Sequence, residues 1–338
     1  MKVLVIGQGG MGRLYCQALR EAGALAGVLV RTAATVERLR SQLAEPIGTN
    51  LEEMLAATGA DALAILPTTD WHAHYLREAI ARGLPALVIK PSCTNADTAE
   101  ALDAQAKAAK VPVLVAHEGV FQPAFVTLEA AIAEGRIGAV REVQWLKEGA
   151  EQLSGGRQKD AARPEDLDGT NYGFIYATTM HELYACNRLA GRQAPERAEV
   201  VSVFASATQP RLDARIDYPG LVARLRYNAA PNLPFRRGLN VVGERGSALW
   251  LMEPGKTTLR VKTARETRDL PYHGFSGANP ATPVVAAWLQ SLAAGAAPTE
   301  GLLDGARALR AARMVTKAAA ERQGAEIDLD AIAGGKDM

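Results

Sequence analysis

Short apolar runs alternate with amphipathic helical segments along the first 120 residues. Apolar, largely β-branched runs predict buried strands at residues 3–6, 26–30, 62–66, 86–89 and 111–116. Helical spacing of apolar positions marks residues 11–22, 34–43, 51–58, 71–82 and 95–109. Strands that alternate with helices are typical of a doubly wound parallel sheet. We therefore predict an α/β domain with such a sheet over residues 1–119.

The pattern changes after residue 120. Residues 140–146 read as a strand and 171–190 as a helix, and further strands are predicted at 199–207, 212–217, 221–228, 236–243, 247–253 and 257–262. Two Ala-rich segments, 282–294 and 301–322, read as helices. We predict a second, α+β domain over residues 120–338, with a large, mostly antiparallel open sheet. Helices would cover one face of it, and the last helix, about 301–322, would pack back on the first domain.

The first predicted strand runs into the glycine-rich turn Gly7-Gln8-Gly9-Gly10-Met11-Gly12, a G-x-G-x-x-G motif that opens a helix. Gly7 permits the tight turn, Gly9 lets the backbone approach a pyrophosphate, and Gly12 lets helix and strand pack closely. The first domain therefore reads as a Rossmann dinucleotide-binding domain. The alternative is a flexible turn in an α/β domain that binds no nucleotide.

Arg31 and Thr32 follow the second predicted strand, 19 and 20 residues after Gly12. An acidic residue there would bind the ribose 2′-hydroxyl of NAD, whereas an Arg pairs with the 2′-phosphate of NADP. We expect NADP as the cofactor, with NAD as the alternative. The competing interpretation of Arg31 is a surface residue at a strand end.

Charge and cysteine content exclude several classes of protein. Lys plus Arg is 38 and Asp plus Glu is 37, so a general nucleic-acid or acidic-membrane binder is not expected. Cys16, Cys93 and Cys186 form neither CxxC nor a Cys/His cluster, which argues against a disulfide scaffold or a metal site. The chain shows neither a signal peptide nor an apolar stretch of membrane-spanning length. We expect a cytoplasmic protein.

Four more segments carry a recognisable pattern. They are Leu66-Pro67-Thr68-Thr69-Asp70-Trp71-His72-Ala73, Gly83 to Pro91, Pro123 followed by Ile132 to Gly138, and Val241 to Ser247. With the glycine-rich turn they resemble, in order and spacing, the Gfo/Idh/MocA family of NAD(P)-dependent oxidoreductases. The resemblance implies cofactor contacts from Pro67, Thr68, Thr69 and His72. It also implies a homodimer or homotetramer formed through the open face of the second sheet, which we expect to be apolar.

The resemblance also implies where the chemistry takes place. Lys90, followed by Pro91, matches the Lys of a Glu-Lys-Pro motif at the mouth of the nicotinamide site, with Ile89 replacing the Glu. His181 matches a His on a helix facing the substrate, but Ala177 stands where the family has an Asp. The Arg that commonly precedes Pro123 is also missing, with Val120 near its place.

Hydride transfer to a carbonyl needs a proton donor for the developing alkoxide. Lys90 and His181 are our candidates, and Tyr184, three residues along the same predicted helix face, could replace the missing acid. We expect these groups to cluster around the nicotinamide. His117 and Glu118 end a strand at the carboxyl edge of the sheet, and Tyr172 and Tyr176 lie on the second-domain helix, so these four are candidate substrate contacts. The polar stretch 149–169 is a candidate lid or substrate loop, with a solvated loop as the alternative.

The leading hypothesis is therefore an NADP-dependent oxidoreductase acting on a small polar carbonyl or alcohol, such as a sugar derivative. A second is reduction of a C=N or conjugated bond, as in imine and biliverdin reductases. A third is a dinucleotide-binding regulatory protein without turnover, which would explain Ile89 and Ala177 as lost catalytic residues.

Overall fold

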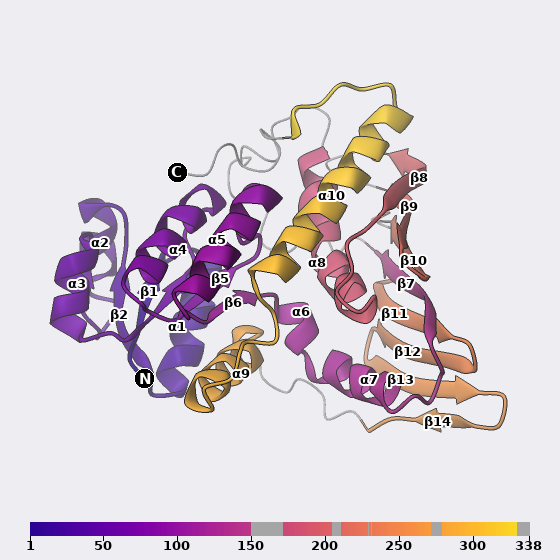
Figure 1. Ribbon diagram of the computed structural model, residues 1–338, viewed down its shortest axis with the longest axis horizontal. Coiled ribbons are helices and arrows are strands. Elements are labelled where there is room, and N and C mark those ends of the chain that lie inside the picture. The colour runs from indigo at the N-terminus through magenta and orange to yellow at the C-terminus, as the bar shows by residue number, and fades with distance from the viewer. Residues whose placement is uncertain (150–171, 205–210, 229, 231, 272–278, 330–338) are drawn as a thin grey trace. The chain divides into compact units, whose positions relative to one another are not determined.

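A computed structural model describes residues 1–149, 172–204, 211–228, 230, 232–271 and 279–329. The chain divides into two compact units (Figure 1). Of the described residues, unit 1 takes in those within 1–121 and 279–306, and unit 2 takes in those within 122–271 and 307–329. The predicted polar loop at 149–169 lies almost wholly outside the described residues.

Unit 1 is built on a parallel sheet of six strands in the order β3-β2-β1-β4-β5-β6. The strands are β1 (Val3–Ile6), β2 (Leu25–Leu29), β3 (Ile47–Gly48), β4 (Ala62–Ile65), β5 (Ala86–Ile89) and β6 (Val113–Ala116). Every residue of β1, β4, β5 and β6 is buried, as expected for continuous apolar strands covered on both faces. This strand order is that of dinucleotide-binding sheets, and it confirms the predicted doubly wound fold.

The helices of unit 1 lie between and after these strands in the chain. They are α1 (Gly10–Glu21), α2 (Ala33–Leu39), α3 (Leu51–Thr58), the 3-10 turn η1 (Thr69–Trp71), α4 (His72–Ala81), α5 (Ala96–Ala108), α6 (Glu118–Phe121) and α9 (Ala281–Ala293). Asn50 and Asn95 each accept a hydrogen bond from a backbone N–H three residues on, which caps α3 and α5.

Helix α9 belongs to unit 1, although a division after residue 119 would assign it to the second domain. It packs against α1 and α6, and its residues Val284, Val285 and Trp288 are buried. The Asn279 side chain donates to the Leu14 carbonyl oxygen at 2.7 Å and ties the start of this segment to α1. A late segment therefore completes the core of the first unit.

Unit 2 is built on an eight-stranded sheet in the order β14-β13-β12-β11-β7-β10-β9-β8. The strands are β7 (Val140–Glu148), β8 (Arg197–Phe204), β9 (Arg211–Tyr218), β10 (Leu221–Asn228), β11 (Arg236–Gly243), β12 (Gly246–Glu253), β13 (Lys256–Thr263) and β14 (Thr267–Asp269). All neighbours are antiparallel except β7 and β10, which run parallel. The predicted α+β fold with a large, mostly antiparallel sheet is confirmed.

Helices cover one face of this sheet, called the inner face below. Helix α8 (Tyr172–Leu189) contacts β7 and β10, and α7 (Pro123–Ala133) contacts β12 and β13. Arg188 of α8 donates to Glu129 of α7, which ties the two helices together. Helix α10 (Leu302–Arg322) starts in unit 1 and continues in unit 2.

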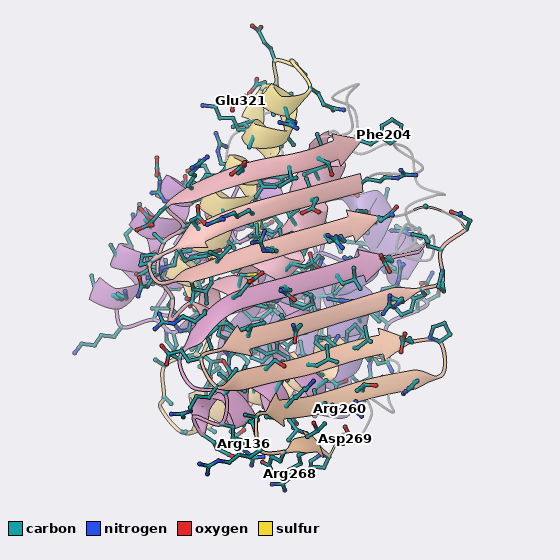
Figure 2. The ribbon with its side chains drawn as sticks, turned by 90° about the vertical axis from the view of Figure 1, so that its right-hand side faces the viewer. Arg136, Phe204, Arg260, Arg268, Asp269 and Glu321 are labelled. Atoms are coloured by element: carbon teal, nitrogen blue, oxygen red, sulfur yellow. The ribbon has the colours of Figure 1, made fainter. Side chains whose placement is uncertain are left out.

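The opposite, outer face of the sheet lies open toward the viewer in Figure 2. Charged side chains pair across it, as in Arg224–Glu142 at 2.6 Å and Arg260–Asp269 at 2.6 Å. The expectation that this face is apolar is wrong for most of its strands, because the two-residue alternation sends their charged residues outward. Apolar residues of this face lie in the middle of the sheet, at Leu146, Val222, Val242, Leu249 and Leu251, and at its β8 edge, where Phe204 is 53% exposed (Figure 2).

Candidate functional site

The turn between β1 and α1 forms a cradle of backbone groups. Gly7 has a φ of +95°, and a Cβ there would lie 2.7 Å from the backbone of Leu66 and Pro67. A Cβ on Gly12 would lie 2.3 Å from the Gly7 carbonyl oxygen. By contrast, a Cβ on Gly9 or Gly10 would meet nothing within 4 Å. Gly7 and Gly12 therefore let strand and helix approach, while Gly9 and Gly10 border open space at the positive end of α1, where a pyrophosphate fits.

Arg31 and Thr32 lie just beyond β2, next to this cradle in the strand order. The Arg31 guanidinium carbon lies 5.6 Å from the centre of the Trp71 ring, and no carboxylate of the described residues pairs with Arg31. Thr32 caps α2, since its hydroxyl accepts from the Thr35 backbone N–H at 3.3 Å. An exposed guanidinium that rests on an indole ring can donate two parallel N–H hydrogen bonds to a phosphate.

Sequence reasoning missed Trp71, although it stands in a turn directly after a buried strand. Its ring packs edge-on against His74, with centroids 5.5 Å apart, and lies 6.0 Å from the Tyr75 ring. The signal available was an aromatic residue at the carboxyl edge of a parallel sheet, which is where such folds bind ligands.

The expected cofactor contacts Pro67, Thr68 and Thr69 lie in the turn after β4. His72 follows them and is 1% exposed. Its Nδ1 lies 2.7 Å from the Pro91 carbonyl oxygen and its Nε2 lies 3.1 Å from that of Pro67. The His72 ring thus links the turns after β4 and β5 and holds them in place relative to each other. The geometry therefore gives His72 a structural role.

Lys90, His117 and Glu118 come together at the carboxyl ends of β5 and β6. The two strands are in register at Ile89 and Ala116, and the Lys90 backbone N–H donates to the Ala116 carbonyl oxygen at 3.1 Å. The Lys90–Pro91 peptide bond is cis, and Lys90 is half-buried, whereas His117 and Glu118 are buried. A cation and a carboxyl group therefore lie on adjacent strand ends.

Glu118 accepts a hydrogen bond from the Tyr15 hydroxyl at 2.9 Å. Burial raises the pKa of the Glu118 carboxyl, and the Tyr15 bond and the Lys90 charge oppose that rise. Burial, together with the Glu118 charge, raises the pKa of Tyr15 well above its ordinary value, so Tyr15 remains a donor. Sequence reasoning missed Tyr15, which was hidden among the apolar positions of α1.

Helix α8 of unit 2 carries the remaining predicted catalytic residues. His181 is half-buried, while Tyr184 and Tyr176 are 1% and 4% exposed. All residues from Glu182 to Asn187 are buried, so burial does not separate the face of Tyr184 from that of His181. Tyr172 begins the helix, and its side chain lies outside what the structure describes. The roles of these four residues stay predictions.

A buried ion pair lies beside His181 in sequence. Lys147 of β7 lies 3.3 Å from Glu182 of α8, with side chains 13% and 6% exposed. The Lys147 ammonium lies 5.7 Å from the Tyr227 ring centre, and burial raises the pKa of Tyr227. Sequence reasoning missed this pair, because strand β7 and helix α8 are separated by the polar stretch and neither residue belongs to a motif.

The described ranges contain no group of three or more His, Cys, Asp or Glu side chains that could hold a metal ion. Among their helices, none combines the length and the hydropathy needed to cross a membrane.

Comparison with known proteins adds to this geometry. Residues 1–117 match the model of the GFO_IDH_MocA oxidoreductase family, described by its NAD-binding Rossmann fold. The chain is 26% identical over 228 residues to the myo-inositol dehydrogenase Hyg17 of Streptomyces leeuwenhoekii, a match that spans 67% of this chain and 66% of that relative.

Solved structures share the whole fold. UDP-N-acetylglucosamine 3-dehydrogenase GnnA from Acidithiobacillus ferrooxidans superposes with a TM-score of 0.73 at 21% identity, covering 94% of this chain and 97% of that one. An oxidoreductase from Agrobacterium radiobacter, solved with NAD+, L-tartaric acid and magnesium, gives a TM-score of 0.76 at 19% identity, covering 98% and 99%. At these identities the likeness concerns the fold.

Proposed function

We propose that this protein, whose residues 1–117 match the model of the Gfo/Idh/MocA family, is an NADP-preferring oxidoreductase of that family. It transfers a hydride between nicotinamide and a small polar carbonyl or alcohol of sugar-like character. Relatives named as dehydrogenases of inositol and of a sugar nucleotide support that substrate class.

The observation that carries the proposal is the cradle at the switch point of the six-stranded sheet. Gly9 and Gly10 border open space at the N-terminus of α1, between β1 and β4, where the strand order reverses. The Arg31 guanidinium, which no described carboxylate neutralises, favours the 2′-phosphate of NADP over the 2′-hydroxyl of NAD.

Lys90 is the proposed acid. Bound NADP supplies the hydride donor or acceptor, and the chain supplies the proton and the orientation. As a carbonyl becomes an alkoxide, the Lys90 ammonium donates a proton to the substrate oxygen, and in oxidation the neutral amine takes that proton back. The buried Glu118 carboxyl interacts electrostatically with the Lys90 ammonium. His181 is proposed as a second group that orients the substrate oxygen or donates to it.

Two measurements test the proposal. NADP should raise the melting temperature of the purified protein more than NAD at equal concentration, and equal or larger stabilisation by NAD would contradict the cofactor preference. NADPH oxidation is then followed with a panel of sugar-derived ketones and a panel of cyclic imines. Turnover of ketones supports the proposal, turnover of imines alone favours C=N reduction, and binding without turnover on either panel favours a regulatory protein.

A further inference from the structure

Trp71 stands in a turn whose backbone is held in place on both sides. It ends the 3-10 turn η1 after β4, and its backbone N–H donates to the Thr68 carbonyl oxygen at 3.0 Å. The next residue, His72, is 1% exposed, and its ring lies between the carbonyl oxygens of Pro67 and Pro91. The backbone that carries the Trp71 indole is therefore fixed at the carboxyl edge of the six-stranded sheet.

Two aromatic rings of α4 constrain the indole itself. The His74 ring packs edge-on against it with centroids 5.5 Å apart, and the Tyr75 ring centre lies 6.0 Å away. The His74 and Tyr75 rings pack edge-on against each other at 4.9 Å, and Tyr75 is buried. Close packing of this kind restricts the side-chain conformations that the half-buried Trp71 can adopt.

Arg31 reaches this indole from another strand. It follows β2, whereas Trp71 follows β4, and β1 lies between these two strands in the sheet. The Arg31 guanidinium carbon lies 5.6 Å from the Trp71 ring centre, within the range of a cation–π contact. Burial raises the pKa of Tyr75, and the Arg31 charge opposes that rise, so the guanidinium also acts on Tyr75. The contact spans the end of β1, where the glycine-rich turn starts.

Other exposed arginines of unit 1 are held in a different way. Arg20 pairs with Glu45 at 2.7 Å, and Arg40, at the end of α2, pairs with Glu37 at 3.2 Å. Arg31 has no carboxylate partner among the described residues, and its guanidinium rests on an indole instead. An indole restrains the position of a guanidinium without neutralising its charge.

This difference matters for a residue that binds an anion. A solvent-exposed arginine populates many rotamers, and a ligand that binds it must order the side chain at a cost in free energy. Stacking on the indole orders the guanidinium before the ligand arrives, which lowers that cost. It also leaves the in-plane N–H groups of Arg31 for hydrogen bonds to a phosphate.

We propose that Trp71 is a positioning residue for cofactor choice, because it holds the Arg31 guanidinium where the 2′-phosphate of NADP binds. This rests on the proposed function, in which Arg31 is the group that favours the 2′-phosphate. Trp71 acts through Arg31 and makes no contact with the phosphate. It therefore strengthens the binding of NADP and leaves the binding of NAD, which lacks the phosphate, as it is.

The test is calorimetric titration with NADPH and NADH, and the readout is the ratio of the two Kd values, called the cofactor preference. Trp71→Leu keeps an apolar side chain but removes the ring. We expect it to lower the preference about twofold to tenfold, through weaker NADPH binding at an unchanged Kd for NADH. Trp71→Phe keeps a weaker aromatic face and should give a smaller loss. A purely structural role would weaken both cofactors alike, and either this result or a wild-type preference in Trp71→Leu would overturn the proposal.

A double variant tests whether the effect passes through Arg31. Arg31→Ala should lower the preference at least about tenfold, the range for a charge-assisted hydrogen bond. Trp71→Leu added to Arg31→Ala should then change the preference no further, and an additional loss would refute the route through Arg31. Arg40→Ala, which removes an exposed arginine at the far end of α2, is the matched control and should keep the wild-type preference.

The outcome does not depend on whether Trp71→Leu folds. If it does not, Trp71→Phe takes its place in the cycle with Arg31→Ala, and an undiminished preference in Trp71→Phe then contradicts the proposal.

Failure of this inference differs from failure of the proposed function. A wild type that binds NADPH no better than NADH refutes the cofactor preference, and the role of Trp71 falls with it. A wild-type preference for NADPH that survives Trp71→Leu refutes the role of Trp71 alone. A preference that is lost in Trp71→Leu and in Arg31→Ala, in a protein that turns over no carbonyl or imine, supports the role of Trp71 and refutes the oxidoreductase.

Discussion

Lys90 is the residue on which the proposed chemistry depends. It stands at the end of β5, beside the buried Glu118. We expect Lys90→Met to lower turnover by about 10²–10⁴-fold, the range for a lost general acid, while the Kd for NADPH changes little. Steady-state kinetics and a cofactor titration check this. Lys107→Met, at an exposed lysine of α5, is the control and should retain wild-type turnover. Wild-type turnover in Lys90→Met would assign Lys90 a structural role.

Glu118 makes stability depend on pH in a defined direction. Burial raises its pKa above the ordinary value of 4.5, whereas in the unfolded chain the carboxyl loses its proton near 4.5. Between 4.5 and the raised value the folded protein holds more protons, so the contribution of Glu118 to the free energy of unfolding falls as pH rises. Glu118→Gln removes this cost, and we expect its stability relative to the wild type to increase with pH.

Urea unfolding at several pH values from about 5 to about 8 measures that difference. A flat difference for Glu118→Gln would mean that Glu118 titrates alike in the folded and unfolded states.

At the scale of the element, different glycines of the β1–α1 turn serve chain packing and cofactor binding. Gly12→Ala places a Cβ 2.3 Å from a backbone oxygen, and such overpacking should cost about 1–3 kcal/mol of stability. Gly9→Ala meets no atom within 4 Å, so it should fold like the wild type but bind NADP more weakly, since its methyl group occupies the pyrophosphate approach. Unfolding curves and cofactor titrations of both variants check this. Unchanged NADP affinity in Gly9→Ala would contradict the proposed cradle.

Elements with a regular pattern were predictable from the sequence. The spacing places a helix at 51–58 and a strand at 236–243, and α3 and β11 have these bounds. The two-residue β3 and the four-residue α6 are too short to show periodicity and escaped notice. The glycine cradle followed from a local motif. The Tyr15–Glu118 bond and the Lys147–Glu182 ion pair depend on segments far apart in the chain, and no local pattern encodes them.

At the scale of the whole molecule, we predict self-association through the outer face of the eight-stranded sheet. Leu249 and Leu251 lie there amid ion pairs, and a stable interface needs about 1,200–2,000 Å² of buried surface. We expect light scattering to give the mass of a dimer or tetramer, and Leu251→Glu to give a monomer. Val126→Glu, at an exposed position of α7, is the control and should leave the mass unchanged. A monomeric wild type would contradict the prediction.

Strand β7 occupies the middle of the eight-stranded sheet, although it precedes the other seven strands in the chain. Each of its flanks, β8 to β10 and β11 to β14, joins strands that are neighbours in sequence and can pair soon after synthesis. A nascent chain therefore carries β7 with both edges unpaired until residue 228 has left the ribosome, and with the edge that faces β11 unpaired until residue 243 has left it. This interval exposes β7 to strand pairing with other chains. Charged side chains at Glu142, Lys147 and Glu148 would limit such pairing while β7 waits for its partners.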